Sequence, residues 1–159
     1  MKSWIESKAM AFIKAESQRL SPKETGGLLL GYWAGDEVIV TLATGPGPQS
    51  KHRKSSYTPD LKFDRDQIAK SYQESRGIIT YLGDWHSHPK GGSGLSDDDI
   101  ITLFNISTYE PARAATPIML IAAKDLLEWT PVVWKAEIQV VGGEYCTHLL
   151  KLQILEFSK

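Results

Sequence analysis

Residues 84–99 read Asp-Trp-His-Ser-His-Pro-Lys-Gly-Gly-Ser-Gly-Leu-Ser-Asp-Asp-Asp and contain most of the recognisable chemistry of this chain. An apolar run over residues 78–82 precedes them and predicts a β-strand. Side chains two positions apart on a strand point to the same side, so His86 and His88 can reach one ion. Pro89 cannot donate to a sheet and ends the strand, and the glycine-rich residues after it predict a turn.

A helix is predicted to begin at Ser96, directly after this turn. Ser96 and Asp99 stand at positions i and i+3, so their side chains share one helix face that can point back at the histidines. Two imidazoles and one carboxylate leave a fourth coordination position for water, whereas structural zinc sites are closed by four ligands, mostly thiolates. His86, His88 and Asp99 are therefore predicted to bind one catalytic zinc ion.

Each of these features also has an ordinary structural explanation. Two histidines at a strand end can be loop residues, and Ser-Asp-Asp-Asp at a helix start is favoured by capping and by the helix dipole. The joint pattern favours a metal site, because a strand, a turn and a helix bring all three ligands together.

The segments His86–Pro89 and Ser96–Asp99 resemble the signature of the JAMM metallopeptidases, also called the MPN-plus or JAB family. That signature includes an upstream glutamate, and residues 22–31 match its segment in type and place, with Glu24 as the glutamate. The resemblance covers roughly residues 4–123. It implies an α/β protein with a single mixed β-sheet flanked by helices, the JAB/MPN fold, which is similar to the cytidine-deaminase fold.

The resemblance implies a zinc-dependent isopeptidase whose partner is a ubiquitin-like protein or its conjugate. Glu24 would be the general base and proton shuttle, and Ser96 would donate a hydrogen bond to the oxyanion. The chain looks most like stand-alone prokaryotic members, which include deconjugating peptidases of CBASS anti-phage operons. Two alternatives within the family are processing of a small sulfur-carrier protein that ends in Gly-Gly and a non-catalytic scaffold.

Length, charge and cysteine content narrow the class of protein. The 159 residues fit one domain, residues 1–159, that can bury a core without disulfides. A formal net charge of −1 provides no bulk attraction for nucleic acid or anionic membranes. The single cysteine, Cys146, is expected to be buried, and the absence of a second cysteine fits a reducing compartment. One cysteine also excludes a deaminase zinc site, which needs two cysteine ligands. No signal peptide or membrane span is predicted, so we expect a soluble cytoplasmic protein.

The remaining elements follow from periodicity and turn residues. We predict helices over residues 3–19, 58–75 and 96–109, strands over 25–33, 37–44, 78–85 and 117–123, and one or two strands over 126–141. The helix 58–75 is expected to pack through Leu61, Phe63, Ile68 and Tyr72. Residues 149–157 fit either an edge strand or a short helix. The basic loop 45–56 is either a solvated surface or a contact for an acidic region of a protein substrate.

Overall fold

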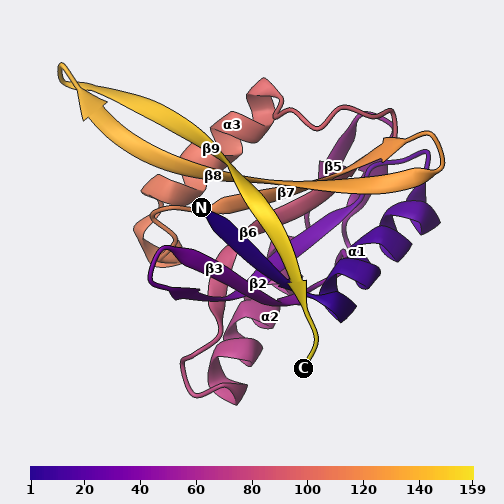
Figure 1. The fold of residues 1–159 in the computed structure, drawn as a ribbon, viewed down its shortest axis with the longest axis horizontal. Helices are drawn as coiled ribbons and strands as arrows, with labels where there is room; N and C mark the ends of the chain where they lie inside the picture. Colours follow the sequence, from indigo (N-terminus) through magenta and orange to yellow (C-terminus); the bar gives the residue numbers. More distant parts are fainter.

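The computed structural model describes residues 1–159, whose main strands form one mixed sheet that closes into a barrel (Figure 1). The strand order around the barrel is β1-β3-β2-β6-β7-β8-β9, and β4 and β5 form a separate hairpin. The mixed α/β architecture is confirmed, and closure of the sheet is an additional feature. In chain order the elements are β1 (Lys2–Glu6), α1 (Ser7–Leu20), β2 (Gly26–Ala34), β3 (Glu37–Ala43), β4 (Lys51–Arg53), β5 (Ser56–Thr58), α2 (Leu61–Glu74), β6 (Thr80–His88), α3 (Asp97–Thr108), a 3-10 turn (Glu110–Ala112), β7 (Ile118–Asp125), β8 (Glu128–Val141) and β9 (Glu144–Phe157).

The two ends of the chain close the barrel. The first part of β9 pairs with β8, and Gln153 to Phe157 pair in parallel with Lys2 to Glu6 of β1. The predicted helix 3–19 is therefore wrong at its start, because residues 2–6 form a strand. The helix α1 begins after Glu6, whose side chain caps it by accepting hydrogen bonds from two backbone N–H groups. The C-terminal segment is a strand rather than a helix, and it is paired rather than left at an edge.

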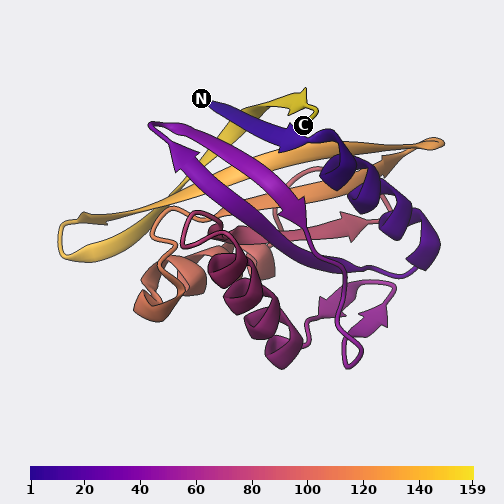
Figure 2. The same cartoon turned by 90° about the horizontal axis from the view of Figure 1, so that it is seen from below.

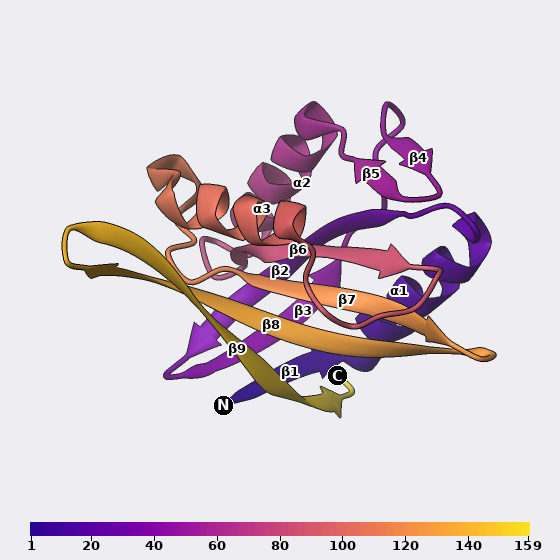
Figure 3. The same cartoon turned by 90° about the horizontal axis from the view of Figure 1, so that it is seen from above.

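The barrel has an apolar interior and a second, smaller core under α3. Along β7, Ile118, Leu120 and Ala122 face the interior, whereas Met119 and Ile121 lie on the outer face beneath α3. The helix α1 contributes to the interior core through Ala9, Met10 and Ile13. Helices α2 and α3 lie on the same outer side of the barrel, with the β4–β5 hairpin beside α2 (Figures 2 and 3).

Two predictions about burial are wrong. Leu61 and Tyr72 of α2 are exposed, and the buried residue of this helix is Asp64. Cys146 is also exposed, because it lies near the tip of the long β8–β9 hairpin that extends beyond the barrel (Figures 1 and 3). None of the helices combines the length and apolar character that a membrane crossing requires.

Gly83 allows β6 to lie against β7. Its φ is +147°, and a Cβ atom at this position would lie 1.8 Å from the carbonyl oxygen of Ile118. Gly83 and Ile118 are the first pair in the parallel register that continues to His88 and Ala123. The placement of both histidines therefore depends on a residue without a side chain at Gly83.

We predict that Gly83→Ala will lower the free energy of unfolding by at least about 3 kcal/mol, because the added methyl group collides with backbone atoms. Urea denaturation measures this difference. The control is Gly35→Ala, where φ is also positive but no atom lies within 4 Å of the added carbon, so the expected loss is only about 1 kcal/mol. Equal losses in the two variants would show that the close contact at Gly83 has no special role.

Candidate metal centre

The side chains of β6 alternate between the interior and the outer face of the barrel. Trp85 and Ser87 are 1% and 0% exposed and face inward, whereas His86 and His88 lie on the outer face and are partly buried. The predicted alternation is confirmed. Both imidazoles therefore lie on the side of the barrel that α2 and α3 cover.

Ser87 joins β6 to the beginning of β2. Its hydroxyl oxygen accepts a hydrogen bond from the Thr25 N–H at 3.0 Å, and its own N–H donates to the Thr25 carbonyl oxygen at 2.9 Å. Gly26 pairs with His86 in the same antiparallel register. Glu24, two residues earlier, is thereby brought to the cavity that both histidines line. Strand periodicity indicates that Ser87 faces away from the histidines, but this hydrogen bond joins residues 62 positions apart and has no local sequence signal.

The helix α3 supplies the carboxylate. Ser96 caps the helix and accepts a hydrogen bond from the Asp99 N–H at 3.1 Å, and Asp99 Oδ2 accepts from the Ser96 N–H at 2.8 Å. This capping box fixes the orientation of Asp99, whose Oδ1 lies 3.2 Å from His86 Nε2. Burial raises the pKa of Asp99, but hydrogen bonds from His86 and Ser96 outweigh this effect and bring it to about 2. Asp99 is therefore ionised, as a metal ligand must be.

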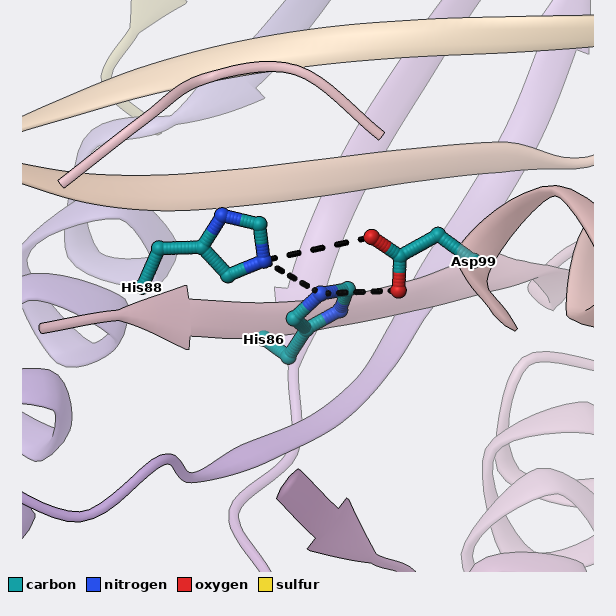
Figure 4. A group of neighbouring side chains, drawn as sticks. All are labelled: His86, His88 and Asp99. Carbon is teal, nitrogen blue, oxygen red and sulfur yellow. Dashed lines mark hydrogen bonds and ion pairs between the residues drawn. The ribbon is translucent and has the colours of Figure 1, made fainter. Parts of the chain in front are cut away.

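The three predicted ligands converge at one point (Figure 4). The Nε2 atoms of His86 and His88 are 3.0 Å apart, His88 Nε2 lies 3.9 Å from Asp99 Oδ2, and all ligand atoms lie within 4.8 Å of one another. Ligands on a tetrahedral zinc ion lie about 3.3 Å apart when the zinc–ligand bonds are about 2.0 Å. His88 Nδ1 donates to the Gly92 carbonyl oxygen at 2.7 Å, which leaves Nε2 free to bind a metal. The donor set and its spacing therefore fit a zinc ion.

Glu24 and Ser96 line the same cavity of about 540 Å³ as the three ligands. Burial raises the pKa of Glu24 above its usual value, and the opposing effects of His86 and His88 are smaller. The Glu24 backbone is held by the β4–β5 hairpin, since its N–H donates to the Arg53 carbonyl oxygen at 2.7 Å and His52 Nδ1 donates to the Glu24 carbonyl oxygen at 3.0 Å. The basic loop thus contains a hairpin that positions Glu24, and His52 lies outside the metal-ligand group.

The cavity also has acidic walls that the sequence analysis missed. Asp84 lies two residues before His86 on the same strand, and Asp64 reaches the cavity from α2. Burial and the charge of Asp84 raise the pKa of Asp64 to about 7. The spacing of Asp84 from His86 was the available sequence signal, whereas Asp64 resembles any polar residue of a surface helix.

The chain matches the family described as prokaryotic homologs of the JAB domain over residues 6–135. It belongs to this family. A similar protein is the probable metalloprotease y4qB of Sinorhizobium fredii, which is 31% identical over 133 residues that cover 82% of this chain and 81% of that protein. The resemblance identified from the signature residues is thus confirmed for this prokaryotic JAB protein.

Other relatives are named CD-NTase/cGAS isopeptidase. The protein of Enterobacter hormaechei is 25% identical over 124 residues, covering 76% of this chain and 67% of that protein. The protein of Escherichia coli is 30% identical over 67 residues, covering 42% and 43% of the two chains. The solution structure of protein DSY2949 from Desulfitobacterium hafniense has the same fold, with a TM-score of 0.69 and 17% identity over 99% of this chain and 94% of that one.

We predict that His88→Ala will reduce the zinc content from about one ion per chain to a small fraction of it, because two ligands hold zinc far less tightly than three. Elemental analysis after dialysis at neutral pH measures the content, and circular dichroism verifies the fold. His148→Ala removes an exposed histidine of β9 and is the matched control. Stoichiometric zinc in His88→Ala would contradict the ligand assignment.

We also predict that the change in the free energy of unfolding caused by Asp64→Asn will be more favourable at pH 8 than at pH 5. The difference between the two pH values should be about 2 kcal/mol. The folded-state pKa of about 7 is raised from 3.8, so the folded state keeps its proton in a range where the unfolded state has lost it. The wild type therefore loses stability as the pH rises through this range, and the amide does not titrate. Urea denaturation at both pH values tests this, with Asp66→Asn on the exposed face of α2 as the charge control. An equal effect of Asp64→Asn at both pH values would contradict it.

Proposed function

We propose that this prokaryotic JAB protein is a zinc-dependent isopeptidase or peptidase that cleaves after the C-terminal glycine of a ubiquitin-like protein or its conjugate. The observation that carries the proposal is the convergence of Glu24, His86, His88, Ser96 and Asp99 on one cavity. The isopeptidase names of the relatives support a protein conjugate as the substrate. The resemblance to CBASS-associated peptidases supports a bacterial, cytoplasmic, anti-phage role.

The proposed roles follow from the position and protonation of each residue. His86, His88 and Asp99 would hold the zinc ion, which when bound acidifies water to a pKa of about 7 and polarises a carbonyl group. Glu24 has the raised pKa of a proton carrier, so it accepts a proton from the attacking water and returns it to the leaving amine. The Ser96 hydroxyl oxygen accepts a hydrogen bond from the Asp99 backbone N–H, so the hydroxyl proton remains available. Ser96 donates this proton in a hydrogen bond to the substrate carbonyl oxygen as negative charge develops there.

The preference for glycine follows from the surroundings of the metal ligands. The cleft is enclosed by the β4–β5 hairpin, β6 and the beginning of α3, whose side chains line it together. A tail that ends in glycine carries no side chain beside the scissile carbonyl and can lie extended in such a cleft. A sulfur-carrier protein that ends in Gly-Gly satisfies the same requirement and is the alternative substrate. A non-catalytic scaffold would not require the complete set of five residues.

We predict that the zinc form will cleave tail-extended fusions of ubiquitin-like proteins from the genome that encodes this chain, directly after the terminal glycine. Sulfur-carrier fusions, human ubiquitin chains and an unrelated unfolded protein are incubated in parallel. Mass spectrometry identifies the cleaved bond, and a chelator should abolish cleavage. Digestion of the unfolded protein at many sites, with all fusions intact, would replace the proposal with a general metallopeptidase.

Glu24→Gln is the catalytic control in the same experiment. It keeps the shape of the side chain and the zinc ligands but removes the proton acceptor, so kcat should fall by at least about 100-fold. The zinc content should remain that of the wild type. Glu74→Gln, an exposed substitution on α2, should leave kcat unchanged. Wild-type turnover in Glu24→Gln would assign the proton transfer to another group.

A further inference from the structure

The cavity continues from the metal ligands along β6 to a second group of side chains. Asp84 lies two residues before His86 on the same face of the strand, which corresponds to about 7 Å along the strand. Asp64 of α2 and Tyr57 of β5 lie near Asp84, and Thr102 of α3 lines the same cavity. Asp84 is near enough to His86 for the two charges to influence each other, and Asp64 in turn lies near Asp84.

Asp64 has the features of a residue whose partner is absent. The residue is 7% exposed, and its Oδ1 atom has no hydrogen-bond partner although it is fully buried. Asp84 accepts one hydrogen bond, from the Tyr81 hydroxyl at 2.7 Å, and no lysine or arginine forms an ion pair with either carboxyl group. A buried carboxyl group without a donor is destabilising, so its presence in a cavity wall calls for a ligand that supplies donors.

We propose that Asp64 and Asp84 bind a lysine or arginine side chain of the substrate, within about two residues of the scissile bond. This proposal rests on the peptidase function proposed above. An ammonium or guanidinium group carries several N–H donors and positive charge, whereas no hydrogen-bond donor of the protein reaches the Asp64 carboxyl group or the second oxygen of Asp84. An extended side chain of this kind is about as long as the two-residue strand spacing of about 7 Å between His86 and Asp84.

A divalent cation fits this part of the cavity less well. Calcium takes six to eight oxygen ligands, and magnesium keeps a rigid octahedral shell. The cavity provides two carboxyl groups here, one of them already bonded to Tyr81. The cations of the cavity, Lys54 and Lys90, lie on the hairpin side, where Lys90 Nζ donates to Ser55 Oγ at 3.2 Å. They leave the acidic end for a cation that enters with the substrate.

The raised pKa of Asp64 supports this assignment. Burial is the main cause, and the charges of Asp84 and Asp60 add to it, so the pKa is about 7. A bound cation would favour the ionised carboxylate and displace its proton. Binding of a cationic side chain near pH 7 should therefore release protons, whereas binding of a neutral side chain should not.

The direct test uses small probes and the zinc-loaded protein. Butylguanidinium and its neutral isostere N-butylurea are titrated into the 15N-labelled protein at pH 7, and amide chemical shifts are recorded. We expect saturable shifts at Asp64, Asp84 and Thr102 with butylguanidinium and at least tenfold weaker binding of N-butylurea. Equal affinities of the two probes would overturn the proposal.

Two variants of α2 assign the effect to one carboxyl group. Asp64→Asn keeps the shape of the side chain and should weaken butylguanidinium binding at least tenfold, while Asp66→Asn removes an equal charge from the exposed face and should not. Unchanged binding in Asp64→Asn would overturn the proposal. Elemental analysis should find one metal ion per chain in both variants and in the wild type. A second ion that is lost only in Asp64→Asn would assign the cavity to a metal instead.

A cleavage experiment separates this inference from the proposed function. Fusion substrates keep the terminal glycine and carry arginine, or its neutral isostere citrulline, at the position before this glycine or at either of the two positions after the scissile bond. At one of these positions, kcat/KM should be at least tenfold higher for the arginine substrate than for the citrulline substrate. In Asp64→Asn the ratio of these two kcat/KM values should approach one. Cleavage without any such preference refutes the cation site and leaves the peptidase intact. Guanidinium binding that depends on Asp64, without cleavage of any substrate, refutes the peptidase and leaves the cation site intact.

Discussion

The pairing of β2 with β6 is the constraint on which the rest of the site depends. The hydrogen bonds between Thr25 and Ser87 and the pair Gly26–His86 set the register. A shift of one residue would turn both histidines into the barrel and Trp85 out of it. The buried indole of Trp85 resists that shift, since its Nε1 also donates to the Thr44 carbonyl oxygen at 2.9 Å. The apolar interior therefore determines where the polar site lies.

The parts of the structure that could be predicted from the sequence are those specified by short-range geometry. The pair His86 and His88 follows from the period of a strand, and Ser96 with Asp99 follows from the turn of a helix. The errors occur where distant segments meet. Residues 2–6 become a strand because they pair with residues 38–40 and 153–157, and no local pattern contains that information. The same long-range pairing makes a strand of the C-terminal segment, whose apolar period is not clean.

Asp64 shows a different limit of sequence analysis. Its helix carries apolar residues on more than one side, and Leu61 and Tyr72 were expected to be buried because apolar side chains usually are. The structure turns them to solvent and directs a carboxyl group inward, because the face of α2 that meets β2 and β6 also borders the cavity. A rule based on hydrophobic burial fails where a helix covers a functional cavity instead of a core.

Three of the carboxyl groups that line this cavity, those of Asp99, Glu24 and Asp64, differ mainly in the hydrogen-bond donors that reach them. Asp99 receives hydrogen bonds from His86 and Ser96, so its pKa falls to about 2 and it remains an anion. Burial raises the pKa of Glu24, and the nearby histidines partly oppose this effect. Such a pKa suits a group that gains and loses a proton. Burial raises the pKa of Asp64 to about 7, and no hydrogen-bond donor of the protein reaches its buried Oδ1. The first two groups suit a metal ion and a transferred proton, and the third is the one for which we propose a partner from outside the chain.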